Sequence, residues 1–219
     1  MSMAQVRCLA VLWDLDGTLI DSEPLHFRSM AHALTSLGVT ADAELQARTT
    51  GLSESEVLDF CRGSLGIAVS AERWSGLRND YYLARAATLR ARHGALPIFL
   101  GLGRDGIPQA VVSNSARPIV DANLQALSLG DDAVPSISRD DVWMAKPHPE
   151  PYLLAAAQLG LAPEACLVVE DSLAGVCAGV AAGMRVLYWP EGTSAMLPAG
   201  AVTCVASAPD LEARLRALL

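Results

Sequence analysis

The chain has 219 residues, of which 52% are hydrophobic and 18% are charged, so it can bury the core of one large domain or of a domain with a sizeable insertion. This composition excludes a disordered chain, and a net charge of −8 argues against nucleic acid as the main partner. The five cysteines form no C-x-x-C pair, which gives no zinc signature and fits reduced thiols in a cytosolic protein.

The start of the chain, Met1–Arg7, is too short and too polar for a signal peptide. No later apolar run reaches the length that a membrane-spanning helix needs. We therefore expect a cytoplasmic protein that has no membrane partner.

The first predicted strand, Cys8–Trp13, is followed directly by Asp14-Leu15-Asp16-Gly17-Thr18. Ionised groups are seldom buried without partners, whereas ligands bind at the carboxyl ends of strands in open α/β sheets. Gly17 allows a sharp turn and a close approach to a ligand. An ordinary Asp-Gly turn is the alternative, but two carboxylates at a strand end favour chemistry.

The segment from about Asp21 to Arg92 contains helical patterns only. An all-helical block between the first strand and the second is typical of a cap inserted over the carboxyl edge of a sheet. We expect a core of residues 1–20 and 93–219 and a cap of residues 21–92. The predicted cap helices are Pro24–Leu37, Asp42–Arg48, Glu54–Gly63 and Ala71–Arg92.

From residue 95 onward, short apolar runs alternate with helical patterns, which predicts an α/β fold with a mainly parallel sheet. The further predicted strands are Gln109–Val112, Val134–Ile137, Leu167–Val169, Arg185–Tyr188 and Val202–Val205. The predicted helices between and after them are Leu96–Leu102, Pro118–Leu127, Pro151–Leu159, Leu173–Ala181 and Pro209–Leu218.

Two polar sites follow strands in this part of the chain. Ser113-Asn114-Ser115 follows the second strand, where a hydroxyl and free N–H groups can bind an anion, although serine and asparagine are also ordinary helix caps. Glu170-Asp171-Ser172 follows the fourth strand. Carboxylates without nearby histidine or cysteine select a hard cation such as Mg²⁺, and an acidic helix start is the alternative.

Lys146 is the only lysine among 16 basic residues, and all the others are arginine. Its compact ammonium group fits between a carboxylate and a phosphate, where a planar guanidinium differs in shape. A surface lysine in a proline-rich loop is the alternative. Together with the acidic and hydroxyl groups, Lys146 completes what phosphoryl transfer needs, which is positioning and charge stabilisation.

These motifs, in this order, resemble those of the haloacid dehalogenase-like hydrolase superfamily. Asp21-Ser22-Glu23, the helical insertion, Lys146-Pro147-x-Pro149 and Glu170-Asp171-Ser172-x-Ala174-Gly175 are similar to the branch that contains β-phosphoglucomutase and small sugar-phosphate phosphatases. The resemblance covers essentially the whole chain. It implies a Rossmann-like three-layer sandwich with a parallel sheet, and an inserted all-helical cap that acts as a lid.

The resemblance also implies roles for the two aspartates of the first motif. Asp14 would attack phosphorus and form an aspartyl-phosphate. Asp16 would protonate the leaving oxygen and then take a proton from the hydrolytic water. Haloacid dehalogenases lack this second carboxylate, so Asp16 points to phosphate chemistry.

Cofactor and phosphate binding follow from the same resemblance. Mg²⁺ would be held by the Asp14 side chain, the Asp16 backbone carbonyl and Asp171, with Glu170 acting through water. The groups that would hold the phosphoryl oxygens are Ser113 and Lys146, with Asn114 nearby.

We expect a hydrolase of small phosphorylated metabolites, sugars or sugar acids, and a β-phosphoglucomutase-type mutase is the alternative. Mutases of this branch usually carry an arginine soon after a cap glycine, and Gly51-Leu52-Ser53-Glu54 places Glu54 there. Thr18 also fits the Asp-Gly-Thr of phosphatases. More remote alternatives are a receiver-like phosphoacceptor, which would be much shorter, and a non-catalytic protein, although all four motifs are intact.

Three residues near the expected junction of cap and core, Glu23, His26 and Trp143, are candidate substrate contacts. A lone histidine on a helix is, however, more often a packing or surface residue. The branch is often monomeric, so we expect a monomer or a weak oligomer.

Overall fold

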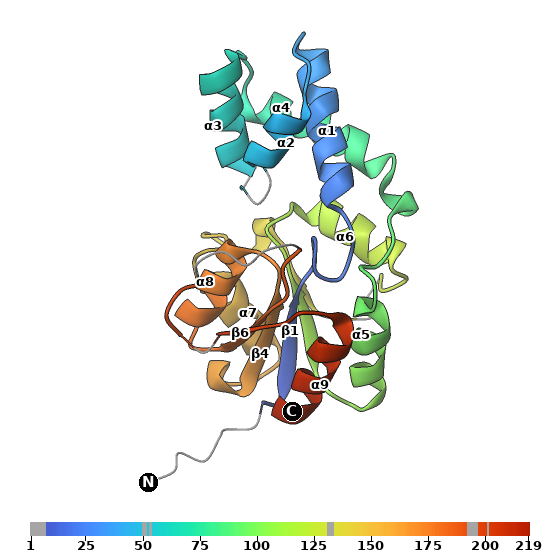
Figure 1. The fold of residues 1–219 in the computed structure, drawn as a ribbon, viewed down its shortest axis with the longest axis vertical. Coiled ribbons are helices and arrows are strands. Elements are labelled where there is room, and N and C mark those ends of the chain that lie inside the picture. The colour runs from blue at the N-terminus through green and yellow to red at the C-terminus, as the bar shows by residue number, and fades with distance from the viewer. Residues whose placement is uncertain (1–7, 50–51, 53, 131–133, 192–196, 201) are drawn as a thin grey trace.

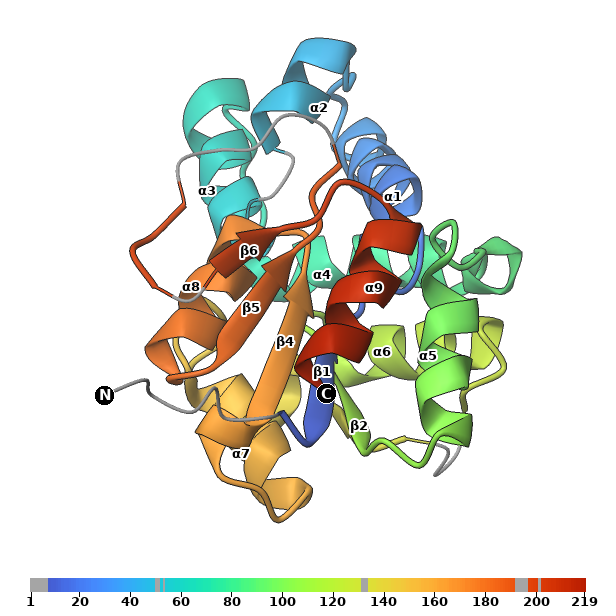
Figure 2. The same ribbon diagram turned by 60° about the horizontal axis from the view of Figure 1, so that its bottom comes forward.

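The computed structural model describes residues 8–49, 52, 54–130, 134–191, 197–200 and 202–219 (Figure 1). These residues form a parallel sheet of six strands in the order β3-β2-β1-β4-β5-β6 (Figure 2). The strands are β1 (Ala10–Asp14), β2 (Gln109–Val112), β3 (Ser136–Ile137), β4 (Cys166–Glu170), β5 (Arg185–Tyr188) and β6 (Val202–Cys204). The α/β Rossmann-like fold is therefore confirmed, with β1 between β2 and β4.

Helices cover both faces of the sheet and make the three layers. The helices of this part are α5 (Ala95–Arg104), α6 (Arg117–Ala126), α7 (Glu150–Gln158), α8 (Leu173–Ala181) and α9 (Ala208–Leu218). Alternate residues of β1 point to opposite faces, so Trp13 packs with α5, α6 and α9, while Leu12 packs with α7 and α8. Both faces of the sheet are buried, as the continuous apolar strands require.

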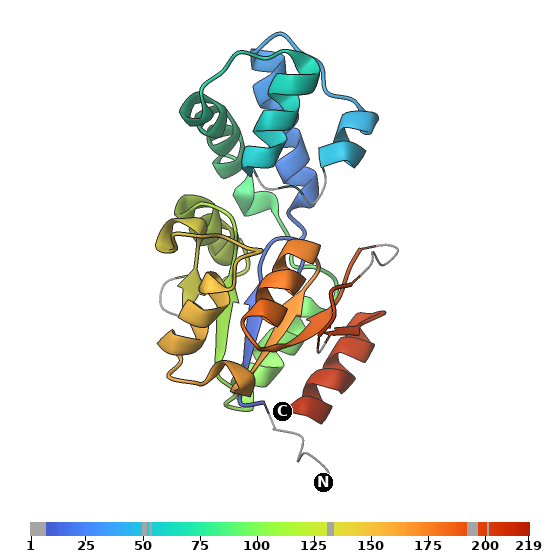
Figure 3. The same ribbon diagram turned by 90° about the vertical axis from the view of Figure 1, so that its left-hand side faces the viewer.

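A helical block stands at the carboxyl edge of the sheet (Figures 1 and 3). It consists of α1 (Glu23–Ser36), α2 (Ala43–Thr49), α3 (Glu54–Leu65) and α4 (Ala71–Leu83). The block has an apolar core of its own, in which Leu34, Cys61 and Trp74 are fully buried. None of the helices in the described residues is long and apolar enough to cross a membrane.

The chain crosses between the sheet and the helical block twice, and these crossings pair with each other. Ile20 forms an antiparallel bridge with Ala91, and the Arg92 N–H donates to the Leu19 carbonyl at 2.9 Å. The predicted helix Ala71–Arg92 is wrong in its second half. It ends at Leu83, a short 3-10 turn follows at Ala86–Thr88, and the backbone of Arg90 and Arg92 bonds to the first crossing instead of continuing a helix.

The side chain of Arg92 joins these two crossings to the sheet by hydrogen bonds. Its buried guanidinium donates to the carbonyls of Gly17 at 2.8 Å and Trp189 at 2.7 Å, and lies 3.8 Å from the centre of the Trp189 ring. We expect Arg92→Ala to lower the free energy of unfolding by about 2–4 kcal/mol, because it removes charge-assisted bonds and leaves buried carbonyls unpaired. Denaturant unfolding measures this loss.

The neighbouring Arg90 provides a matched control for this prediction. It is exposed, and its guanidinium bonds only to nearby carbonyls of Thr88 and Leu89. Arg90→Ala should cost less than about 1 kcal/mol. An equal loss in the free energy of unfolding for the two substitutions would contradict this role of Arg92.

Candidate active site

The motifs predicted from the sequence meet at the carboxyl edge of the sheet, because three neighbouring parallel strands end there. Asp14 ends β1, Glu170 ends β4, and Ser113 follows β2. Lys146 reaches the same point from the loop before α7. The structure thus brings the four motifs into one place.

Lys146 forms the buried centre of the site. Its Nζ donates at 2.7 Å to Asp14 Oδ1, to Glu170 Oε1 and to the carbonyl of Val112. Burial alone would lower the pKa of Lys146, but the charges of Asp14 and Glu170 outweigh burial and raise it, so the ammonium stays charged. The alternative interpretation of Lys146 as a surface lysine in a proline-rich loop is wrong, since this residue is 5% exposed.

Three carboxylates lie together here, and two of them, Asp14 and Glu170, contact the Lys146 ammonium group. Oxygens of Asp14, Glu170 and Asp171 lie within 4.8 Å of one another. Asp14 Oδ2 is buried without a hydrogen-bond partner. Burial, followed by repulsion from Glu170, raises the pKa of Asp14 and brings the pKa of Asp171 to about 8. An all-oxygen cluster with excess negative charge and an unpartnered oxygen fits a hard divalent cation.

Gly17 closes one side of this cluster. Its φ is +81°, and a Cβ atom there would lie 2.2 Å from Asp171 Oδ2. Any side chain at this position would therefore strain the backbone and push Asp171 away. The predicted need for glycine in this turn is confirmed.

Glu170 is held by two side chains to which the sequence assigned no role. The fully buried Tyr152 donates from its hydroxyl to Glu170 Oε1 at 2.8 Å, and Ser172 donates from its Oγ to Oε2 at 2.9 Å. The tyrosine directly before the apolar residues of α7 was the available signal, because a buried tyrosine hydroxyl usually has a partner.

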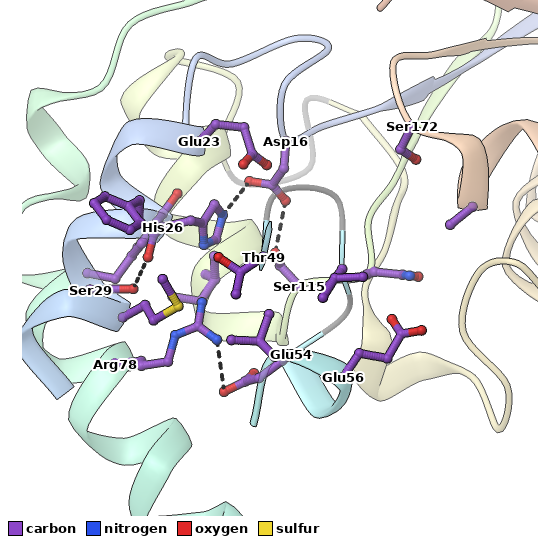
Figure 4. Close-up of a pocket in the computed structure, with 18 of the residues that line it drawn as sticks. Asp16, Glu23, His26, Ser29, Thr49, Glu54, Glu56, Arg78, Ser115 and Ser172 are labelled. Atoms are coloured by element: carbon purple, nitrogen blue, oxygen red, sulfur yellow. Dashed lines mark hydrogen bonds and ion pairs between the residues drawn. The ribbon is translucent and has the colours of Figure 1, made fainter. Parts of the chain in front are cut away.

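Asp16 lies on the pocket side of the cluster and accepts bonds on both oxygens. Oδ1 lies 2.8 Å from Ser22 Oγ and 3.2 Å from His26 Nε2, while Oδ2 accepts from Ser113 at 2.8 Å and from Ser115 at 2.9 Å. Figure 4 shows the contacts of Asp16 with His26 and Ser115. Burial would raise the pKa of Asp16, but the bonds from His26, Ser22 and Ser113 lower it overall. The resting group is therefore a carboxylate that protein hydrogen bonds stabilise.

A cavity of about 890 Å³ opens between the helical block and this edge. The core side of the lining includes Asp14, Asp16, Asn114, Lys146 and Asp171, and the helical side includes Glu23, His26, Glu54, Arg78 and Tyr82. Its size suits a small metabolite rather than a macromolecule.

The other residues predicted from the sequence lie outside the carboxylate cluster. Asn114 donates to the Lys146 carbonyl at 3.0 Å and accepts from its N–H at 2.9 Å, so its amide holds the lysine loop. Trp143 is 91% exposed and is not among the residues that line the cavity. Residues 51 and 53, part of the segment that separates mutases from phosphatases, lie outside the described residues, whereas Glu54 faces Arg78 at 3.7 Å.

Fold and site together define an α/β protein with a buried carboxylate–lysine cluster at the wall of a metabolite-sized cavity. A family model of haloacid dehalogenase-like hydrolases matches residues 8–183. The chain belongs to this family.

The chain is also similar to individual proteins of known name and to solved structures. The chain is 34% identical over 194 residues to hexitol phosphatase A of Escherichia coli, with 83% of each chain covered. It is 29% identical over 201 residues to a phosphorylated carbohydrates phosphatase of Thermotoga maritima, covering 90% of this chain and 93% of that protein. A T. maritima structure assigned as a β-phosphoglucomutase matches with a TM-score of 0.77 and 26% identity, over 96% and 99% of the two chains.

Proposed function

We propose that the protein is a Mg²⁺-dependent phosphatase that hydrolyses small phosphorylated sugars or polyols through an aspartyl-phosphate. The observation that carries this proposal is Asp14, whose Oδ1 is fixed by Lys146 while the buried Oδ2 has no partner. A carboxylate so placed at the wall of a metabolite-sized cavity suits nucleophilic attack.

The first step transfers the phosphoryl group. An Asp14 oxygen attacks phosphorus, the bond from phosphorus to the ester oxygen breaks, and Asp16 gives a proton to that oxygen, so the alcohol leaves. Lys146 and Ser113 balance the charge on the phosphoryl oxygens. A dianionic phosphate that engages Ser113 takes a donor from Asp16 and adds negative charge, and both changes favour the protonated form of Asp16.

The second step releases phosphate. Asp16, now a carboxylate, accepts a proton from a water molecule that attacks phosphorus, and the bond to Asp14 breaks. The residues that would hold Mg²⁺ are Asp14, Asp171 and the Asp16 carbonyl, with Glu170 through water. When bound, the cation offsets the negative charge of the phosphoryl group and of the carboxylates.

Hydrolysis is favoured over the mutase alternative by the helical side of the cavity. Glu54 stands where mutases of this branch usually carry an arginine, and it makes this wall less able to bind a second phosphate. The mutase stays the second candidate because of the T. maritima neighbour. We also propose residues 21–92 as a cap that moves about the crossings at Ile20 and Ala91.

Phosphate release from a panel of hexitol, hexose and sugar-acid phosphates tests this function. We expect release that requires Mg²⁺ and stops on chelation. A control with β-glucose 1-phosphate and its bisphosphate detects mutase activity. Isomerisation without phosphate release would establish the mutase, and neither reaction on any compound would contradict both candidates.

The pKa of Asp171 makes cation binding depend on pH. Its folded-state pKa, about 8, lies above that of an unfolded aspartate, so without a cation the proton stabilises the fold and this contribution is lost as the pH rises toward 8. A cation must displace this proton, so Mg²⁺ should bind about 10–100-fold more tightly at pH 8 than at pH 6. Titration calorimetry measures the affinity, and Asp171→Asn should flatten its pH dependence. Equal affinities at both pH values in the unmodified protein would contradict this role of Asp171.

A further inference from the structure

Asn123 is a buried polar residue on α6 that the mechanism above does not use. Its side chain is fully buried among apolar neighbours on the same helix, including Ile119, Val120 and Leu124. Packing alone would favour another apolar residue there, because an amide without partners is costly to bury. The partners of Asn123 therefore explain its presence.

These partners join the helical block to the candidate acid. The hydroxyl of Tyr82, on α4, donates to Asn123 Oδ1 at 2.9 Å, and Asn123 Nδ2 donates to Asp16 Oδ1 at 2.9 Å. The Tyr82 ring lies against the His26 ring, with centroids 4.6 Å apart, and His26 Nε2 is 3.2 Å from the same Asp16 oxygen. Tyr82 thus contacts two of the three groups around Oδ1, and Ser22 Oγ is the third, at 2.8 Å.

The chemistry of these groups gives the chain of bonds a direction. A tyrosine hydroxyl that donates to the amide oxygen fixes the amide so that its NH₂ group faces Asp16. An amide nitrogen can only donate, so Oδ1 accepts the bond from Asn123, beside the one from the Ser22 hydroxyl. Oδ2 faces the hydroxyls of Ser113 and Ser115, which can donate or accept.

We propose that Tyr82 and Asn123 are positioning residues that hold Asp16 with Oδ2 toward Ser113 and Ser115, so that the proton for the leaving group is delivered from Oδ2. This inference rests on the proposed function. It states that Tyr82, in the helical block, positions the general acid Asp16. In the step concerned, the Asp14 oxygen bonds to phosphorus, the ester bond breaks, and the Asp16 proton moves to the departing alkoxide oxygen.

The test compares two leaving groups. A sugar or polyol alkoxide needs a proton as it leaves, whereas p-nitrophenolate leaves without one. The ratio kcat/KM covers only steps up to loss of the leaving group, so the later role of Asp16 as a base does not enter. A residue with a merely structural role should affect both substrates alike.

We expect Tyr82→Phe to lower kcat/KM for the best polyol or sugar phosphate about 10-fold, and Asn123→Leu about 10–100-fold. Both variants should keep kcat/KM for p-nitrophenyl phosphate within about threefold. Tyr82→Phe removes one oxygen only and carries the test if Asn123→Leu fails to fold. Tyr81→Phe is the matched control, because the Tyr81 ring stacks on His32 and not on His26, and it should leave kcat/KM unchanged for both substrates.

Asp16→Asn separates this inference from the proposed function. A selective loss on the alkyl substrate for Asp16→Asn, shared in smaller size by Tyr82→Phe, supports both. If Asp16→Asn is selective but Tyr82→Phe and Asn123→Leu lower both substrates equally, or neither, the positioning role is overturned and the proposed function stands. If Asp16→Asn itself is unselective, the acid role of Asp16 in the proposed function fails, and the positioning role fails with it.

Discussion

Asp14→Asn is expected to lower phosphate release by about 10⁴-fold or more while leaving the fold intact. The amide cannot attack phosphorus, so the covalent route is lost, and what remains is catalysis by the rest of the site. Steady-state phosphate release, with circular dichroism to check the fold, measures both parts of this prediction.

The same substitution should not destabilise the protein. Asp14 is a buried carboxylate whose pKa is raised by burial and by Glu170, so replacing it with a neutral amide relieves repulsion within the cluster. We expect a melting temperature equal to or above that of the unmodified chain. Substantial residual turnover would remove Asp14 from the nucleophile role, and a large fall in melting temperature would contradict the account of the cluster.

Lys146→Met should have the largest effect on stability, a loss of about 3–5 kcal/mol, together with the loss of activity. Lys146 is the single ammonium group that lies 2.7 Å from both Asp14 and Glu170, and its removal leaves two buried carboxylates without a cation. Denaturant unfolding without added metal measures the loss. Since acid protonates the carboxylates, the loss should shrink as the pH falls.

Two further variants separate charge from shape at this position. Adding Glu170→Gln to Lys146→Met removes one of the stranded carboxylates, so the double variant should be more stable than Lys146→Met alone. Lys146→Arg keeps the charge but not the compact ammonium, and should recover stability more than activity. A double variant less stable than Lys146→Met would contradict the ion cluster described above.

The parts of the site that could be predicted from the sequence are the residues that end or directly follow the strands of the sheet. Asp14, Ser113 and Glu170 each follow an apolar run, and the carboxyl ends of parallel strands meet at one edge whatever the details of packing. Lys146 could be singled out because it is the only lysine of an arginine-rich chain. Local pattern and composition are enough for such residues.

The residues that could not be predicted act through contacts between distant segments. Tyr152 and Asn123 lie on helices whose apolar pattern shows which face is buried. The pattern does not show which polar group of another segment that face contacts. The end of α4 at Leu83 was missed for a similar reason. Residues up to Arg92 keep a helical pattern, but residues 84–89 form local turns, and Arg90 and Arg92 bond to a segment that is distant in the sequence.

The central claim, that Asp14 carries the phosphoryl group, is tested most directly by trapping the intermediate. The enzyme is quenched during turnover of its best substrate and treated with borohydride, which reduces an aspartyl-phosphate to homoserine, and the peptides are identified by mass spectrometry. We predict homoserine at position 14, and none when substrate is omitted. Homoserine at another aspartate, or none at position 14 in an enzyme that releases phosphate, would contradict the account.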